Sequence, residues 1–146
     1  MNREKFAALF RGIHPKFSRL YAKMLNEIGL SFPQYMLLNQ LALLGAISMT
    51  EISDRLGITK PAVTNLVDRL EKKKYLRRLP HPKDRRISLL EILPKGRHTT
   101  SQIQAQSLDI ILKAYDQYNE TERKIISQFY STLSEVVDTV LNEKRR

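Results

Sequence analysis

Residues 49–70 read MTEISDRLGITKPAVTNLVDRL, and this segment predicts two short helices joined by a tight turn. Gly57 lies at the turn, where a backbone with positive φ is needed and glycine adopts it without steric cost. Ser53 is a small residue at a point where the two helices would approach closely. Apolar residues occur at helical spacing on both sides of the turn. They are Ile52, Leu56, Ile58, Val63 and Leu66. The segment favours a helix-turn-helix, with a generic pair of packed helices as the alternative.

The second of these helices, expected to follow Thr59, has a polar face opposite its apolar stripe. Thr64 and Asn65 on that face can donate to and accept from the edges of DNA bases, and the ring of Pro61 can contact a thymine methyl group. Lys60 lies at the helix N-terminus, where its charge and the free backbone amides both favour phosphate. The face fits DNA recognition, with an ordinary solvated helix face as the alternative.

Positive charge is concentrated beside this helix. The 146-residue chain has 25 Lys and Arg against 15 Asp and Glu, a formal net charge of +10. Nine basic and only two acidic residues lie in residues 69–86, so this segment carries +7 of the total. Such a charge indicates a polyanionic partner, with nucleic acid as the first candidate and an anionic membrane as the second. A charge that serves only solubility is the alternative.

Residues 75–79 and 87–92 lose the helical period and are predicted to be short strands, and Pro80 and Pro82 indicate a projecting loop between them. A hairpin tipped by arginines, directly after a DNA-reading helix, is typical of a wing. The weakly hydrated guanidinium group suits a narrow minor groove, where the negative potential is focused. Asp84 lies two residues before Arg86 and could hold its guanidinium group. A surface ion pair of little consequence is the alternative.

Long helices are predicted on both sides of this central segment. Residues 6–28 form one amphipathic pattern that ends near Gly29, and Ser31 with Gln34 has the pattern of a capping box that starts a second helix. Apolar periodicity returns in residues 103–115 and 125–141. We therefore predict a mainly α protein with a small β-hairpin wing, organised as a single domain over residues 1–146. The winged helix-turn-helix occupies about residues 31–93, between long terminal dimerisation helices at about 2–29 and 94–146.

The two terminal regions carry more apolar surface than a small winged helix can cover. Left exposed, their stripes would exceed the few hundred Å² of contiguous apolar surface that is typical of monomers. Packing against a symmetry-related copy would bury the stripes and produce a homodimer. Packing of the first and last helices against each other within one chain is the alternative.

Residues 66–71 read LVDRLE, and the predicted wing contains Asp84-Arg85-Arg86. With the order of the helices, these motifs resemble the multiple-antibiotic-resistance regulator (MarR) family over nearly the whole chain. The resemblance implies a two-fold dimer, built from the first and last helices, that binds pseudo-palindromic operators and usually represses transcription. It also implies that Arg86 enters the minor groove with Asp84 as its support. Leu93 departs from the family pattern, because many members have a threonine cap there.

We therefore predict a sequence-specific regulator that binds double-stranded DNA as a homodimer. A winged-helix module that contacts another protein and does not read DNA is the alternative. The candidate DNA contacts are Thr59, Lys60, Pro61, Thr64, Asn65, Arg69, Arg77, Lys83, Asp84, Arg85 and Arg86. The resemblance also implies release of DNA by a small aromatic or anionic effector bound beside the first two helices. The candidate effector contacts are His14, Phe17, Tyr21 and Tyr35, for which core or interface packing is the alternative.

Other classes of function find no support in the sequence. There is no glycine-rich phosphate loop and no recognisable nucleophile or acid–base constellation, so we predict that the chain is not an enzyme. The chain has no cysteine and its three histidines are scattered, so we expect no metal and no cofactor. No segment has the length and apolar composition of a signal peptide or a membrane span, and we expect a cytoplasmic protein with no membrane partner.

Overall fold

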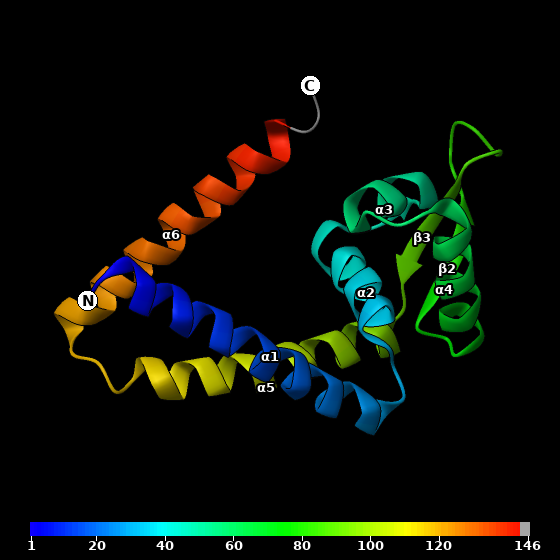
Figure 1. Cartoon of the computed structure of the whole chain (residues 1–146). Helices are drawn as coiled ribbons and strands as arrows, with labels where there is room; N and C mark the ends of the chain where they lie inside the picture. Colours follow the sequence, from blue (N-terminus) through cyan, green and yellow to red (C-terminus); the bar gives the residue numbers. More distant parts are fainter. Residues whose placement is uncertain (144–146) are drawn as a thin grey trace. The chain divides into compact units, whose positions relative to one another are not determined.

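The computed structural model describes residues 1–143 and contains six helices and three short strands within that range (Figure 1). In chain order these are α1 (Arg3–Ile28), α2 (Phe32–Leu44), β1 (Ile47–Ser48), α3 (Met49–Leu56), α4 (Lys60–Lys72), β2 (Leu76–Pro80), β3 (Ser88–Ile92), α5 (Pro94–Tyr115) and α6 (Glu120–Glu143). The predicted mainly α fold with a β-hairpin wing is confirmed. The strand β1 was not predicted.

The chain divides into two compact units, residues 1–105 and residues 106–146. The first unit contains α1 to α4, the small sheet and the first half of α5. The second unit contains the rest of α5 and α6. The candidate DNA contacts all belong to the first unit, so their geometry depends on that unit alone.

Capping hydrogen bonds mark the starts of the helices, and the capping box predicted for Ser31 and Gln34 is one of them. Ser31 Oγ accepts from the backbone N–H of Gln34 at 3.3 Å, and Gln34 Oε1 accepts from the Ser31 N–H at 2.9 Å, which completes a capping box before α2. Ser48 Oγ accepts from the Glu51 N–H at 3.1 Å at the start of α3. These caps satisfy backbone donors that have no partner within the helix, and so they fix where each helix begins.

The sheet has the strand order β1-β3-β2, and both pairings are antiparallel. In the wing hairpin Leu76 pairs with Ile92 and Pro80 pairs with Ser88, so the strands are in register along their whole length. The strand β1 adds Ile47 beside Leu90 at the inner edge of the hairpin. This pairing ties the hairpin to the segment that leads into α3.

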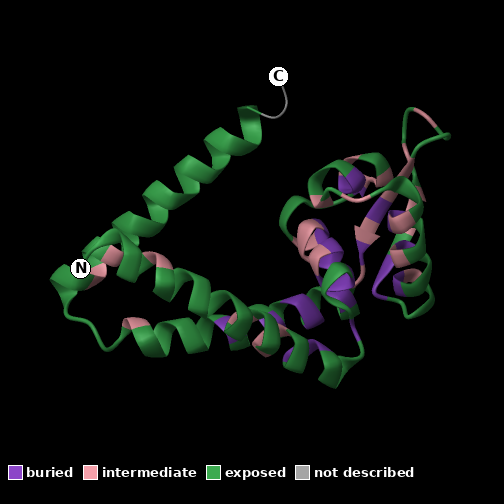
Figure 2. Cartoon of the chain, in the orientation of Figure 1, coloured by how far each residue is buried: buried purple, intermediate pink, exposed green. Residues whose placement is uncertain are grey.

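The core of the first unit lies between α2, the inner face of α4 and the sheet (Figure 2). It includes eight side chains with no exposed surface. These are Leu37, Leu38, Leu41, Ile52, Val63, Val67, Leu70 and Leu90. On the apolar stripe of α4, the predicted Val63 is buried, as are Val67 and Leu70, and the predicted Leu66 is partly buried. Burial of this face leaves the opposite face of α4 in solvent.

Two backbone features hold α5 against the end of α4. Lys74 adopts a φ of 62°, the left-handed conformation that glycine accepts more readily, and it turns the chain from α4 into β2. The carbonyl oxygen of Tyr75 accepts from the Leu93 N–H at 2.9 Å, directly before α5. Gly96 in the first turn of α5 lies so close to this carbonyl that a Cβ there would collide with the Tyr75 oxygen. The first turn of α5 is thus packed closely against Tyr75.

Candidate nucleic-acid interface

The outer face of α4 carries the side chains that were predicted to read DNA. Thr59 accepts from the Ala62 N–H through its Oγ1 at 3.3 Å and caps the helix, and Pro61 occupies the first turn. Ser53 fixes the turn before it, because its hydroxyl donates to the Ile58 carbonyl at 2.6 Å. The exposed residues on this face include Thr59, Lys60, Pro61, Thr64, Asn65 and Arg69. The structure therefore gathers the helix part of the predicted site on one solvent-facing surface.

The hydroxyl hydrogen of Thr64 is already used in a hydrogen bond within α4. It donates to the Lys60 carbonyl at 3.1 Å, one turn earlier in α4. Its lone pairs stay available, so Thr64 in this conformation is an acceptor for a base amino group. The sequence predicted that this hydroxyl could both donate to and accept from DNA. In the structure only its role as an acceptor stays open to DNA.

The strand β2 runs back along α4, and Arg78 joins the two elements. Its guanidinium group contacts Asp68 Oδ1 and Glu71 Oε1, both at 2.5 Å, and the Arg78 N–H donates to Glu71 Oε2 at 2.9 Å. Hydrogen bonding to Asp68 is the main cause that raises the pKa of Arg78, so the cation is retained. Pairing between a partly buried arginine and two carboxylates sets the wing at a defined angle to α4.

Arg78 was not among the predicted site residues. The sequence placed it in the basic segment, as one more charge for DNA. The spacing of Asp68 and Glu71 by three residues on α4 was the available signal, because it puts two carboxylates on one face of the helix. In the structure this face meets β2, and Arg78 forms ion pairs with both groups.

At the tip of the wing, Asp84 holds Arg86. Asp84 Oδ1 accepts from the Arg86 backbone N–H at 3.0 Å and from Arg86 Nε at 3.2 Å. These two bonds are the main causes that lower the pKa of Asp84, so its carboxyl group stays ionised. The Arg86 side chain is 92% exposed although its guanidinium group is bonded to Asp84. The structure therefore has the Asp84–Arg86 pair that was expected from the sequence.

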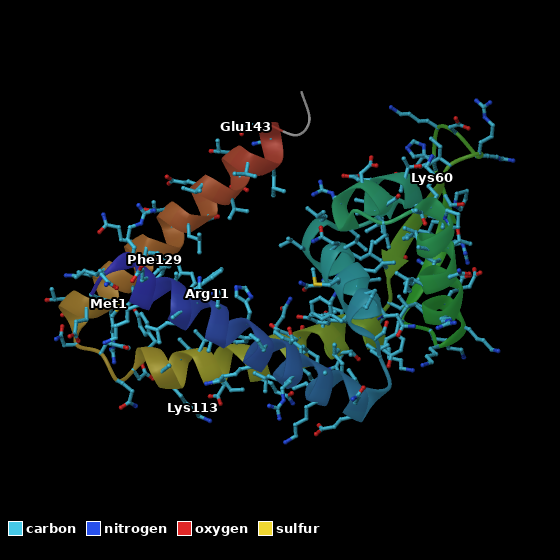
Figure 3. The ribbon with its side chains drawn as sticks, in the orientation of Figure 1. Met1, Arg11, Lys60, Lys113, Phe129 and Glu143 are labelled. Carbon is cyan, nitrogen blue, oxygen red and sulfur yellow. The ribbon has the colours of Figure 1, made fainter. Side chains whose placement is uncertain are left out.

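The other basic candidates differ in their surroundings. Lys83 and Arg85 are exposed in the wing loop. Arg77 lies on β2 and its Nε contacts Glu91 Oε2 on β3 at 2.5 Å, so part of its charge is offset. Figure 3 labels Lys60 at the end of α4 that lies toward the wing loop, whereas Lys72 ends the helix twelve residues later. The start of the basic segment 69–86 therefore lies at the C-terminal end of α4, and its wing loop lies toward the N-terminal end. The positive charge of the segment is divided between the two ends of the helix.

Comparison with known proteins relates the winged helix to one family. The model of the MarR family matches residues 28–87, from the end of α1 to the wing. The multiple antibiotic resistance protein MarR of Salmonella typhimurium is 30% identical over 84 residues, which are 58% of this chain and 58% of that protein. Over residues 28–87 the chain is similar to the MarR family.

One further relative and one solved structure of similar fold extend the match beyond the winged helix. The transcriptional repressor MdtR of Bacillus subtilis is 26% identical over 132 residues, 90% of this chain and 83% of MdtR. The crystal structure of Streptococcus pneumoniae FabT in complex with DNA has a TM-score of 0.75 at 18% identity, over 92% of this chain and 99% of FabT. MarR-family members are DNA-binding transcription regulators, and the prediction that the chain is not an enzyme is confirmed.

A pocket of about 510 Å³ lies between α1 and the start of α2 in the MarR-family fold of this chain. His14, Phe17 and Tyr21 line it, as do Leu30 and Phe32, which the sequence interpretation did not select. Tyr35 does not line it. Its buried ring lies 5.9 Å from that of Tyr21, and burial raises the pKa of Tyr35, with Tyr21 adding to the effect.

Within residues 1–143, no three His, Asp or Glu side chains are grouped so that they could hold a metal ion. Over the same range, no helix is long and apolar enough to cross a membrane.

Proposed function

We propose that the protein is a repressor that binds a pseudo-palindromic operator as a homodimer. The outer face of α4 would enter the major groove, and Arg86 would enter the adjacent minor groove. The observation that carries this proposal is the pairing of Asp84 with an otherwise exposed Arg86, beside an exposed polar face of α4. MdtR, which is named a transcriptional repressor, supports the direction of regulation. With DNA as its partner, the protein would act in the cytoplasm.

The proposed groove contacts agree with the chemistry of each element. An α-helix fits the major groove, where the donors and acceptors of each base pair form a distinct pattern. The wing tip suits the minor groove, since Arg86 projects a guanidinium group with little surrounding bulk. FabT has a similar fold and its structure is a complex with DNA, which supports the same use of the fold here.

The first experiment concerns the helix. We expect Thr64→Ala and Asn65→Ala each to weaken operator binding by about 1–3 kcal/mol, because each removes a contact to base edges. Binding to random-sequence DNA should change much less. Operators selected from random duplexes by the parent protein, titrated beside unselected duplexes, measure both affinities. Equal losses on the two kinds of DNA would show that these residues touch only the backbone.

The dimer is supported by apolar surface that the chain leaves open. No residue of α6 is buried, and its exposed side chains include Phe129 and Val140. On α1, Phe6 and Phe10 are about half exposed, at 47% and 52%. Within the second unit, a groove of about 460 Å³ between α5 and α6 is lined by Ile111, Leu112, Tyr115, Tyr118 and Tyr130, among others. A second copy of the chain would cover these surfaces.

We expect light scattering at micromolar concentration to give twice the 17.0 kDa of one chain. The reason is the apolar surface of α1 and α6, which is costly to leave in water. A strict monomer over the concentration range that saturates the operator would contradict the dimeric architecture. In that case the first and last helices would cover each other within one chain.

Effector release is the finer part of the proposal. The pocket between α1 and α2 is mainly apolar, and His14 with the hydroxyl groups of Tyr21 and Ser18 supplies polar groups at its wall. This composition suits a small aromatic compound, in particular one with an acidic group. Occupation of the pocket would press on Leu30 and Ser31, the segment that connects α1 to the winged helix.

The second candidate is a winged helix that binds another protein. Its support is the same exposed face of α4, because exposure alone does not choose the partner. The two functions differ in salt dependence, since DNA binding releases counterions and weakens steeply with salt. The Asp84–Arg86 pair at a projecting tip favours DNA.

A further inference from the structure

His81 lies where the wing loop leaves β2, and its ring is turned back onto the loop. The imidazole Nδ1 accepts from the backbone N–H of Lys83 at 3.1 Å and from that of Asp84 at 3.3 Å. The His81 N–H itself donates to the Ile87 carbonyl at 3.0 Å, across the base of the loop. The side chain and the backbone of one residue therefore close the loop from the inside.

This arrangement gives the ring a defined role. A nitrogen that accepts N–H bonds offers them its lone pair, so Nδ1 faces the loop as an acceptor. A histidine in a basic wing would be expected to contact a DNA phosphate as a positive group. In the structure its Nδ1 holds the loop backbone.

The bonds of His81 continue to the proposed DNA contact. His81 holds the backbone of Asp84, and the Asp84 carboxylate holds both the backbone and the side chain of Arg86. A loop of this kind has many conformations unless its backbone donors are satisfied within the loop. With them satisfied, the carboxylate that aims the guanidinium group has a defined position.

We propose that His81 is a positioning residue for DNA binding, which fixes the wing tip so that Asp84 can direct Arg86 into the minor groove. This inference rests on the proposed function of the wing. Two roles for residue 81 can be distinguished, because they predict opposite effects of a positive charge there. If the residue only neutralises phosphate, a positive charge should strengthen DNA binding. If His81 acts as a hydrogen-bond acceptor, a positively charged side chain that cannot accept should weaken DNA binding.

Asparagine offers a matched variant, since its Oδ1 is bonded to Cγ just as Nδ1 is in histidine. Asparagine is also the residue type that commonly accepts backbone N–H bonds two and three residues ahead in turns. We expect His81→Asn to bind a selected operator within about twofold of the parent, while His81→Ala loses about tenfold through two unsatisfied amides. His81→Lys should also bind more weakly than the parent, although it adds a positive charge.

Coupling to Arg86 distinguishes positioning from a general effect on stability. In an Arg86→Ala background, His81→Ala should cost less than about twofold, because residues that act as one unit are not additive. Hydrogen exchange in the DNA-free protein gives an independent readout. The Lys83 and Asp84 amides should exchange faster in His81→Ala than in the parent or in His81→Asn.

Several outcomes overturn the inference. His81→Lys binding as tightly as the parent, or more tightly, would show that charge is what matters at this residue. An unchanged affinity in His81→Ala, when Arg86→Ala has lost affinity, would overturn the inference and leave the proposed function intact. An Arg86→Ala protein that binds as tightly as the parent would overturn the proposed minor-groove contact, and the role of His81 with it.

Discussion

Arg86→Ala is expected to lower operator affinity by about 3 kcal/mol, roughly a hundredfold. Each wing would lose one charged group from a groove where the negative potential is focused, and a dimer would lose two. The fold should not change, because the side chain is 92% exposed and contributes little to the core. Thermal unfolding of the variant without DNA should therefore match that of the parent.

Asp84→Ala is the companion variant, and its expected effect on DNA affinity is opposite to the effect that bulk electrostatics predicts. Removing a negative charge should strengthen binding to DNA if the wing is only a diffuse positive surface. We expect weaker binding, because Asp84 is bonded to both the backbone and the side chain of Arg86. The salt dependence should flatten by about one unit per wing for Arg86→Ala and change little for Asp84→Ala.

A fluorescent operator titrated at several salt concentrations measures both variants in one experiment. Lys83→Ala is a suitable comparison, since it removes a loop charge that the Asp84 carboxylate does not hold. Tighter binding by Asp84→Ala would show that Asp84 does not position Arg86 for DNA binding. The same result would leave the α4 contacts untouched, because Thr64 and Asn65 are tested separately.

Gly96→Ala is expected to destabilise the protein by about 2 kcal/mol or more. A glycine inside a helix usually costs about 1 kcal/mol relative to alanine, so the general expectation for this change is stabilisation. Here a Cβ would collide with the Tyr75 carbonyl oxygen and approach Ile92 Cγ1 to 2.8 Å. That carbonyl also accepts the Leu93 N–H, so it cannot move without losing a hydrogen bond. Overpacking against such a partner costs more than the helix gains.

Gly12→Ala is the matched control for this change. Gly12 lies inside α1, and beyond its chain neighbours and the backbone of its own helix a Cβ there would meet no atom of the described residues within 4 Å. It should gain stability by about 1 kcal/mol, through helix propensity alone. Urea unfolding of the two variants and the parent gives the comparison. A stabilised Gly96→Ala protein would mean that α5 can shift away from Tyr75 at little cost.

Features with local causes were predictable from the sequence. The start of α2 follows from Ser31 and Gln34, the start of α4 from Thr59, and the turn between α3 and α4 from Gly57, whose φ is 64°. Each depends on residues only a few positions apart. The Asp84–Arg86 pair was predictable for the same reason, because its members lie two positions apart in the sequence.

Features that depend on the packing of distant segments were not predictable. The strand β1 has two residues, too few for a periodic signal, and exists because β3 offers it a free edge. Arg78 looked like another basic residue until β2 was placed beside Asp68 and Glu71. The role of His81 needed the closed conformation of the wing loop, which the spacing of Pro80 and Pro82 does not specify.

The ion pairs of Arg78 have a consequence for the DNA itself. Because β2 is bonded to α4 through Asp68 and Glu71, the protein sets the separation between the helix and the wing tip. One extra base pair between the two contacted sites would move them apart by about 3.4 Å and rotate one relative to the other by roughly 35°. The wing could follow only by breaking those ion pairs. Operator half-sites should therefore vary in the bases between the two contacts and keep the number of those bases constant.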